Sequence, residues 1–309
     1  SYDAASHSFS IDPTNTAFQS LAQGEVQTYS VGYGVTDGMA TTATSVNFTV
    51  IGVNDAPVVS ARVTGTPNED GPIVSVNALG NATDVDDVQF GHALHVTGVP
   101  DLLPAGVSFD AATQKFSLNP GDAAYQYLSK GETLDVAVTY NVSDGLVEVP
   151  TAVVFTVTGK DDAPTVSGAV QMGTVTESGV PVTVDLLANA SDVDHLDVLN
   201  VKIGQGAAIS ASVTGANWSS PIEFTVAHNH LSLDPAQFNA LGGGETLDVS
   251  FNYLVTDGSP QGGDAAASAH VTITGENDAP VSISLSSAHV AENSAAGTVV
   301  GQLTTADPD

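Results

Sequence analysis

The tetrapeptide Asn54-Asp55-Ala56-Pro57 determines the fold of this chain, because it returns as Asn277-Asp278-Ala279-Pro280 and, in a variant form, as Asp161-Asp162-Ala163-Pro164. Each copy follows a run of residues that is rich in threonine and valine and that ends in glycine. The copies recur about every 110 residues, which is the length of one small β-sandwich domain. The chain is therefore expected to be a tandem array of repeats with acidic linkers between them.

Between the linkers, apolar residues alternate with polar ones at the period of two that is typical of half-buried strands. In the segment 131–145, one face of the predicted strand carries Leu134, Val136, Val138, Tyr140 and Val142. The same pattern precedes Asp37-Gly38 and Asp257-Gly258, and a second apolar run follows each Asp-Gly pair. Each repeat is therefore expected to contain a long hairpin. Helical character is limited to single turns near 122–128 and 234–241.

Seven or eight short strands per repeat predict an all-β fold, built from tandem β-sandwich repeats of immunoglobulin-like type. Residues 1–57 are expected to be the C-terminal strands of a truncated repeat. Residues 58–164 form one complete repeat, and residues 165–280 form a second one with a longer insertion. Residues 281–309 supply the first strands of a further repeat.

The charge of the chain is strongly unbalanced, with 35 Asp and Glu residues against only 5 Lys and Arg residues and a net charge of −30. Such a surface argues against binding to nucleic acids or anionic membranes, which requires a basic surface, and it suits a protein that binds cations. The absence of cysteine excludes disulfides, thiolate catalysis and cysteine-ligated zinc. No apolar run reaches the ~18 residues that a membrane span needs.

The directions of the predicted strands place the acidic residues. Glu25 and Asp37 stand at the two ends of one strand, and a strand of that length spans roughly 40 Å, so they lie at opposite poles of the repeat. The partner strand runs back and brings Asp55 to the pole that holds Glu25. In the next repeat the first strand runs away toward Glu69, and the second strand returns with Asp84.

Three junctions are therefore expected to gather acidic and amide side chains. The first junction contains Glu25, Asn54, Asp55, Asp84, Asp86 and Asp144. The second junction contains Glu69, Glu132, Asp161, Asp162, Asp192, Asp194 and Asp257. The third junction contains Glu177, Glu245, Asn277, Asp278, Asp307 and Asp309.

So many carboxylates with so few basic residues repel one another, and a divalent cation relieves that repulsion. Ca²⁺ takes 6–8 oxygen ligands in irregular geometry, whereas Mg²⁺ prefers a tighter octahedron with fewer protein ligands. We therefore predict Ca²⁺ at each junction, with Mg²⁺ as the second choice. The alternative is that these residues only solvate loops, since Asp, Asn and Gly favour turns. The recurrence of the same set favours calcium.

The chain resembles, over essentially its whole length, the cadherin-like and VCBS-type repeats of bacterial RTX-type surface adhesins that are exported by type I secretion. Asp84-Val85-Asp86 and Asp192-Val193-Asp194 match the Asp-x-Asp calcium motif of that family, and Asn54–Pro57 resembles its calcium-binding linker. Residues 291–309 look like the start of a cadherin repeat. The glutamate of the family's Asp-x-Glu ligand pair has counterparts in Glu25, Glu132 and Glu245.

The resemblance implies a calcium-rigidified stalk of a secreted or cell-surface adhesin, which projects a binding tip for cell adhesion or biofilm attachment. Its partners would be calcium ions and the neighbouring repeats of the same chain, with no insertion of this segment into a membrane. Gly52 and Gly275 stand where the family linker has aspartate, and Ala56 and Ala279 replace a later asparagine. These departures imply one or two ions per junction rather than three.

A second hypothesis is a module that binds a glycan or a protein through the insertion around Trp218, the single tryptophan. Tryptophan can stack on a sugar ring, but a lone tryptophan is more often part of a core. His228 and His230 are expected to share one strand face, and a solvated pair is favoured over a zinc site because no third ligand can be named. No serine, histidine and acid form a recognisable catalytic set, so no enzyme activity is expected.

Overall fold

The computed structural model describes residues 1–309 except for 87–92, 204–207 and 260–262. The chain divides into two compact units, Ser1–Lys160 and Asp161–Asp309. Apart from short 3-10 helices, the regular elements of the described residues are strands, so the predicted all-β fold is confirmed. In the part of the chain that the structure describes, no helix has the length and apolar character needed to cross a membrane.

The first unit contains the strands β1 to β13. They are β1 (Tyr2–Asp3), β2 (Ser8–Phe9), β3 (Val26–Thr36), β4 (Thr41–Ile51), β5 (Val58–Val59), β6 (Val63–Gly65), β7 (Val74–Asn77), β8 (Ala82–Thr83), β9 (His95–Thr97), β10 (Val107–Asp110), β11 (Lys115–Leu118), β12 (Thr133–Ser143) and β13 (Glu148–Thr158). A 3-10 helix, η1, covers Thr16–Phe18.

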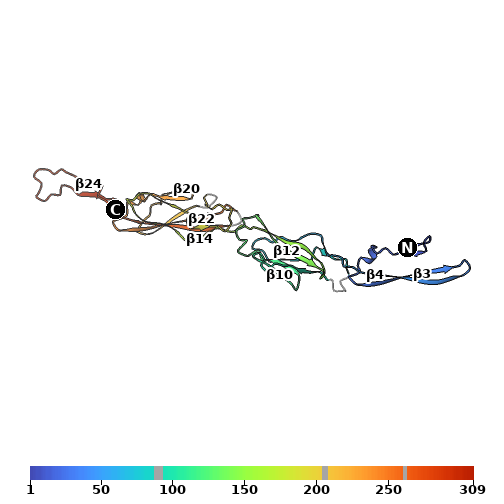
Figure 1. Ribbon diagram of the computed structural model, residues 1–309. Coiled ribbons are helices and arrows are strands. Elements are labelled where there is room, and N and C mark those ends of the chain that lie inside the picture. Colours follow the sequence, from blue (N-terminus) through green and yellow to red (C-terminus); the bar gives the residue numbers. More distant parts are fainter. Residues whose placement is uncertain (87–92, 204–207, 260–262) are drawn as a thin grey trace. The chain divides into compact units, whose positions relative to one another are not determined.

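Two sheets form the sandwich between Val58 and Lys160 (Figure 1). One sheet has the order β6-β13-β12-β9, with β6 parallel to β13, and the other has the order β10-β11-β7. The predicted long hairpin is β12–β13, which pairs from Thr133↔Thr158 to Ser143↔Glu148. Its alternating apolar face is buried as expected, and the Tyr140 hydroxyl donates to the Ala78 carbonyl at 2.6 Å, which ties the two sheets together.

The core between these sheets takes its buried side chains from both of them. Its members are Ala78, Phe116, Leu118, Tyr125, Leu128, Val136, Val138, Tyr140, Val142, Val153, Phe155 and Val157. Burying such apolar side chains stabilises the fold by about 1.5–3 kcal/mol each before the cost of ordering the chain is counted.

The second unit contains the strands β14 to β25. They are β14 (Thr165–Val166), β15 (Val170–Thr176), β16 (Val182–Asp185), β17 (Ala190–Ser191), β18 (Asn200–Val201), β19 (Ser210–Gly215), β20 (Phe224–Ala227), β21 (His230–Leu233), β22 (Thr246–Thr256), β23 (Asp264–Thr274), β24 (Ser282–Leu285) and β25 (Leu303–Ala306). A 3-10 helix, η3, covers Pro235–Phe238.

The sandwich of the second unit repeats the plan of the first. One sheet has the order β15-β23-β22-β18 and the other has the order β16-β21-β20. The insertion predicted in this repeat contributes β19, which pairs with β22 from Ser210↔Asn252 to Gly215↔Leu247 and adds an edge without a counterpart among the described strands of the first unit. The Tyr253 hydroxyl donates to the Leu186 carbonyl at 2.7 Å, as Tyr140 does in the first unit.

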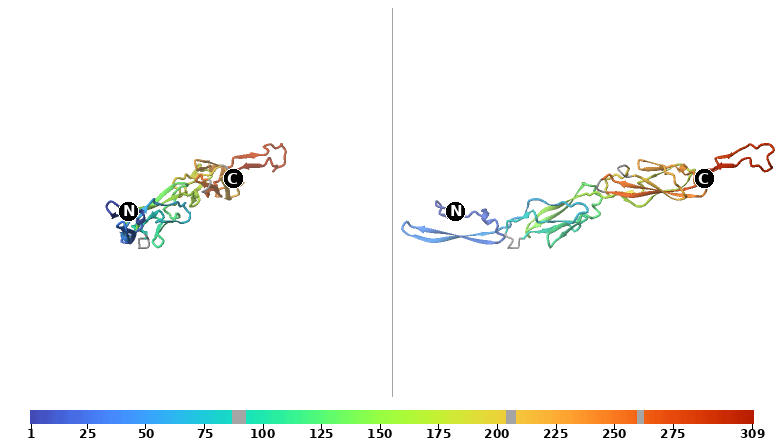
Figure 2. Two further views of the ribbon diagram at one scale, coloured as in Figure 1. Left: turned by 90° about the vertical axis from the view of Figure 1, so that its right-hand side faces the viewer. Right: turned by 180° about the vertical axis from the view of Figure 1, so that it is seen from behind.

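Both ends of the chain contain hairpins with exposed apolar residues (Figure 2). β3 and β4 pair from Val26↔Ile51 to Thr36↔Thr41, as the sequence predicts, but Val31, Tyr33 and Val35 of β3 are exposed. β24 and β25 form a shorter pair from Ser282↔Ala306 to Leu285↔Leu303, with Ile283 exposed.

The expected helical turns are present in different forms. Residues 235–238 form η3, whose N-terminus is capped by Asp234 through its hydrogen bond from the Ala236 N–H. Residues 123–127 form consecutive turns rather than a helix. In each case the turn is followed by a buried leucine, Leu241 or Leu128, which anchors the segment before the long hairpin begins.

Candidate metal centres

Glycine positions each linker against the preceding repeat. An added Cβ at Gly52, Gly159 or Gly275 would lie 2.2, 2.3 or 2.4 Å from a backbone carbonyl oxygen of the loop that precedes the long hairpin. The Gly159 N–H also donates to the Glu132 carbonyl at 2.7 Å, and the equivalent bond recurs in the other two repeats. This close approach explains why glycine stands at these three positions.

One backbone contact recurs at all three linkers. The N–H of the linker aspartate donates to a carboxylate of the following repeat, from Asp55 to Asp86 at 3.1 Å and from Asp162 to Asp194 at 2.8 Å. At the third linker the Asp278 N–H donates to Oδ2 of Asp309 at 3.0 Å. The linker is thereby held against the second aspartate of each predicted Asp-x-Asp motif.

We define the first acidic site as Asn54, Asp55, Asp84, Asp86 and Asp144, all in the first unit. Nδ2 of Asn54 donates to Oδ2 of Asp144 at 2.9 Å, and the Asp86 N–H donates to Oδ1 of Asp84 at 3.0 Å. Asn54 Oδ1 and Asp84 Oδ2 are buried and have no hydrogen-bond partner among the residues that the structure describes. The structure thus brings together five of the six residues expected at the first junction.

Asp144 owes its position to the turn after β12. Its Oδ1 accepts hydrogen bonds from the N–H groups of Leu146 and Val147, both at 2.7 Å, which leaves Oδ2 facing the linker. Burial acts to raise the pKa of Asp144, but the hydrogen bonds from Val147, Asn54 and Leu146 outweigh it and hold the pKa below its ordinary value.

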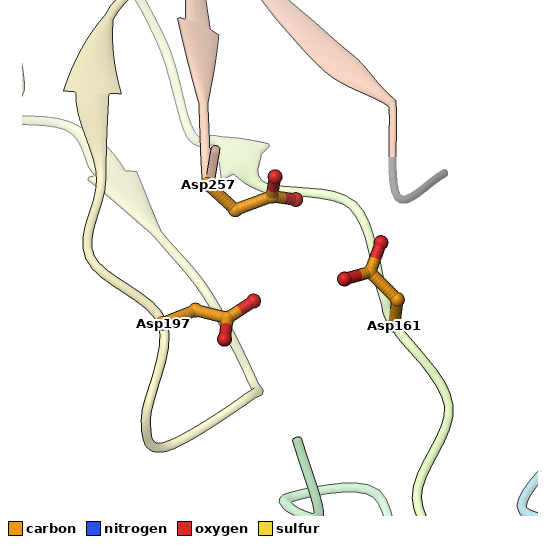
Figure 3. Close-up of side chains that lie close together, drawn as sticks. All are labelled: Asp161, Asp197 and Asp257. Carbon is orange, nitrogen blue, oxygen red and sulfur yellow. The ribbon is translucent and has the colours of Figure 1, made fainter. Parts of the chain in front are cut away.

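The second acidic site, all in the second unit, consists of Asp161, Asp162, Asp192, Asp194, Asp197 and Asp257. Carboxylate oxygens of Asp161, Asp197 and Asp257 lie within 4.8 Å of one another, and Figure 3 shows the three groups converging from the linker, from the loop before β18 and from the end of β22. Asp194 is only 2% exposed, and its Oδ1 lacks a hydrogen-bond partner in the described part of the chain.

The carboxylates of the second acidic site perturb one another. Burial raises the pKa of Asp194 to about 6 against the hydrogen bond from the Asp162 N–H, and Asp197 adds to the increase. Burial also raises the pKa of Asp197, with further contributions from Asp192, Asp161 and Asp257. Burial and neighbouring negative charge therefore act in the same direction on the pKa of both aspartates.

Asp197 was not among the residues predicted from the sequence. It stands three positions after Asp194, in the loop before β18. The sequence Asp192-Val193-Asp194-His195-Leu196-Asp197 does contain a signal, because an acid at this distance from the motif can fold back toward it.

The second junction was also expected to contain Glu69 and Glu132, which belong to the first unit. Glu69 is 1% exposed, and its Oε2 accepts a hydrogen bond from the Lys160 N–H at 2.9 Å, directly before the linker. Glu132 accepts from the Ser129 N–H at 3.2 Å. Within the first unit, Glu69 therefore holds the backbone of Lys160, and Glu132 holds that of Ser129.

The third acidic site consists of Glu177, Asn277, Asp278 and Asp309 in the second unit. Glu177 is 1% exposed, and its Oε1 accepts from the Glu276 N–H at 2.7 Å. Glu177 Oε2 and Asp278 Oδ2 are buried without a hydrogen-bond partner within the described ranges. Burial raises the pKa of Glu177, and the charges of Asp278 and Asp309 raise it further. Asp307, also expected here, is exposed.

The glutamates that begin the long hairpins have a local structural role. Oε2 of Glu25 accepts from the Ala22 N–H at 3.1 Å, and Oε2 of Glu245 accepts from the Gly242 N–H at 3.0 Å. Both bonds close the loop that precedes the hairpin. Neither glutamate forms a hydrogen bond with the linker side chains in the part of the chain that is described.

The expectation that His228 and His230 share a strand face is wrong. His228 and Asn229 have φ angles of 51° and 64° and form the tight turn between β20 and β21, whereas His230 begins β21. The turn replaces the straight strand because two consecutive residues adopt the left-handed conformation.

Trp218 packs against the core of the second unit rather than projecting from it. Its ring is half-buried, and its centroid lies 5.1 Å from that of the fully buried Phe238. This contact corresponds to the core role that a single tryptophan usually has.

The buried oxygens of the three sites fit a hard divalent cation. Carboxylate and amide oxygens are the ligands that Ca²⁺ takes, and a buried oxygen without a donor is costly unless something satisfies it. Two lysines form ion pairs with acids outside the three sites: Lys160 pairs with Asp70 at 3.3 Å and Lys202 pairs with Asp264 at 2.5 Å.

No family match and no curated relative is found for the chain. Among solved structures it is similar to mouse cadherin-23 EC22-24, with 15% identity over 80% of this chain and 74% of that chain and a TM-score of 0.44. It is also similar to mouse clustered PcdhgC3 EC1-3, with 14% identity over 82% and 78% of the two chains and a TM-score of 0.41.

A further similarity is to the endo-fucoidan hydrolase MfFcnA4 from glycoside hydrolase family 107, with 16% identity and a TM-score of 0.26. It covers 81% of this chain but only 34% of that enzyme. Likenesses with such low identities and TM-scores carry nothing about ligands or partners. The strands and registers described above establish the architecture by themselves: two successive β-sandwiches, each built from two sheets.

Proposed function

We propose that this chain is a stalk region of a secreted or cell-surface bacterial adhesin, in which Ca²⁺ at the linkers stiffens a row of β-sandwich repeats. The stalk would project a binding tip for cell adhesion or biofilm attachment. The bacterial source and the export by type I secretion rest on the resemblance of the linkers and Asp-x-Asp motifs to RTX-type adhesins. The stiffening rests on the acidic sites.

The third acidic site is the observation that carries the proposal. Glu177 comes before the linker, Asp278 lies in it and Asp309 comes after it, and the three acids are close enough to interact electrostatically. A cation held by all three would fix the linker to both neighbouring segments. The oxygens it would engage, Glu177 Oε2 and Asp278 Oδ2, are the ones left without a hydrogen-bond partner in the described structure.

The bound ion would supply positive charge that allows the carboxylates to approach one another, and the residues of this chain would position them. The linker N–H groups orient the carboxylates, and the last residue of the linker, Pro57 or Pro164, directly precedes the first strand of the next repeat. At a calcium concentration about 100 times the dissociation constant, one site adds about 2.7 kcal/mol to the stability of the folded state.

Small-angle X-ray scattering of the full chain tests the proposal. The maximum dimension is expected to increase when calcium replaces EGTA, and the distance distribution is expected to become narrower. Asp84→Asn with Asp86→Asn should reduce this response, whereas the exposed loop variant Asp101→Asn should retain it. Equal dimensions in calcium and in EGTA would overturn the proposed stiffening.

A further inference from the structure

The first and second acidic sites differ in the group that faces the aspartate after the long strand. In the first site the Asn54 amide donates to Oδ2 of Asp144 at 2.9 Å, so that oxygen is already satisfied by the protein. In the second site the linker position of Asn54 is occupied by Asp161, a carboxylate that cannot donate. Oδ2 of Asp257 is accordingly buried without a hydrogen-bond partner among the described residues.

Asp197 adds a third carboxylate to this part of the second acidic site. Its carboxylate lies within 4.8 Å of those of Asp161 and Asp257, and Figure 3 shows that the three side chains point toward one another.

The second site also has an independent sign of a ligand. Asp194 is only 2% exposed, and one of its carboxylate oxygens accepts a hydrogen bond from the Asp162 N–H at 2.8 Å. The other oxygen, Oδ1, is buried and without a hydrogen-bond partner in the described structure, as are Asp161 Oδ2 and Asp192 Oδ2. A single cation can satisfy oxygens that no donor of the described chain reaches.

We propose that Ca²⁺ binds the second acidic site more tightly than the first, with Asp197 as an additional ligand, so that the sites fill in a fixed order as calcium rises. The inference rests on the calcium binding proposed above and adds the order of filling. The number of charged ligands is one of the properties that tune calcium affinity over several decades. In the first site the Asn54 amide already donates to Oδ2 of Asp144, so that oxygen gains less from a cation than the unpartnered Oδ2 of Asp257 does.

Isothermal titration of the metal-stripped full chain with CaCl₂ tests the order. Two classes of sites are expected, with dissociation constants that differ by about tenfold or more. Asp197→Asn should weaken the tight class by a similar factor. Asp161→Asn, which recreates the linker sequence of the first site, should do the same. A single class in the unmodified chain, or a tight class that both variants leave unchanged, would overturn the inference.

A reciprocal variant controls for a loss of calcium affinity that is caused by misfolding. Asn54→Asp adds a carboxylate and removes the amide donor, so it should tighten the weak class, and a damaged fold cannot produce that gain. If Asn54→Asp leaves the weak class unchanged or weakens it, the inference fails. A chain that shows neither binding heat nor a calcium-dependent melting temperature contradicts the proposed function itself, whereas binding with equal affinities contradicts only the order.

Discussion

The backbone N–H of Asp162 donates a hydrogen bond to Oδ2 of Asp194 at 2.8 Å. This contact joins the linker to the following repeat, and it fixes one oxygen of a carboxylate that is almost completely buried. The second oxygen, Oδ1, is buried without a hydrogen-bond partner among the described residues. The same arrangement recurs between Asp55 and Asp86, so the backbone of the linker helps to set the position of both carboxylates.

Asp194→Asn is expected to have opposite effects with and without calcium. The amide oxygen can still accept the Asp162 hydrogen bond, but the crowded negative charge is removed. In calcium-depleted buffer at pH 7 the melting temperature should rise by a few degrees, since 1 kcal/mol corresponds to about 2–4 °C for a unit of this size. Addition of calcium should raise the melting temperature of the variant less than that of the unmodified chain, because a ligand is lost. Differential scanning calorimetry checks both effects.

Asp101→Asn is the control for this variant, because Asp101 is an exposed loop residue outside the acidic sites. It should melt like the unmodified chain in both buffers. If Asp194→Asn lowers the melting temperature in calcium-depleted buffer, the repulsion inferred for the second acidic site is wrong.

The stability of the calcium-free chain should depend on pH through Asp194. Burial raises its pKa from 3.8 to about 6, so the folded state binds more protons than the unfolded state between these values. The free energy of unfolding therefore falls as pH rises through this window, and the full cost, up to about 3 kcal/mol, is present above pH 6. Urea unfolding in calcium-depleted buffer at pH 4.5 and pH 7 measures this fall in the free energy of unfolding.

Other acids titrate in the same range, so the comparison with Asp194→Asn isolates the contribution of this group. The variant should lose less stability than the unmodified chain between pH 4.5 and pH 7. Identical losses would show that Asp194 does not carry the raised pKa.

The sequence was sufficient to predict the strands and the poles at which the acids gather. Strict alternation in 131–145 gave the β12–β13 hairpin with its buried face, and the strand directions brought Asp55, Asp86 and Asp144 to one end of the sandwich. These predictions succeeded because period-two patterning and strand length determine which face is buried and where a strand ends.

What the sequence could not provide was local backbone geometry. The tight turn at His228-Asn229 places the two histidines differently from a continuous strand, and no alternation pattern encodes it. Asp197 reaches the second acidic site from a loop, where strand direction gives no guidance. The glycine at each linker is likewise explained only by the carbonyl groups that pack against it.

Gly275→Ala should destabilise the second unit by about 1–3 kcal/mol, because a methyl group has no room there. The added Cβ would lie 2.4 Å from the Gly242 carbonyl oxygen and 2.7 Å from that of Leu241. Gly168→Ala is the matched control, since an added Cβ meets nothing within 4 Å at that position. Chemical unfolding of the two variants measures the difference. Equal stability would show that the loop can move away from the linker at little cost.

Two equivalent strands should differ in the exchange of their amide hydrogens. Residues 247–252 of β22 pair with both β23 and β19, whereas residues 134–139 of β12 pair with β13 alone among the described strands. In an antiparallel ladder every second residue directs its N–H to the same side, so alternate amides of 134–139 lie on an open edge. Hydrogen–deuterium exchange followed by NMR should show fast exchange at these alternate amides and protection throughout 247–252. Deleting β19 (Ser210–Gly215) should convert the pattern of β22 to that of β12. Uniform protection of 134–139 in the unmodified chain would mean that another segment covers the edge and that the two sandwiches are more alike than their pairing indicates.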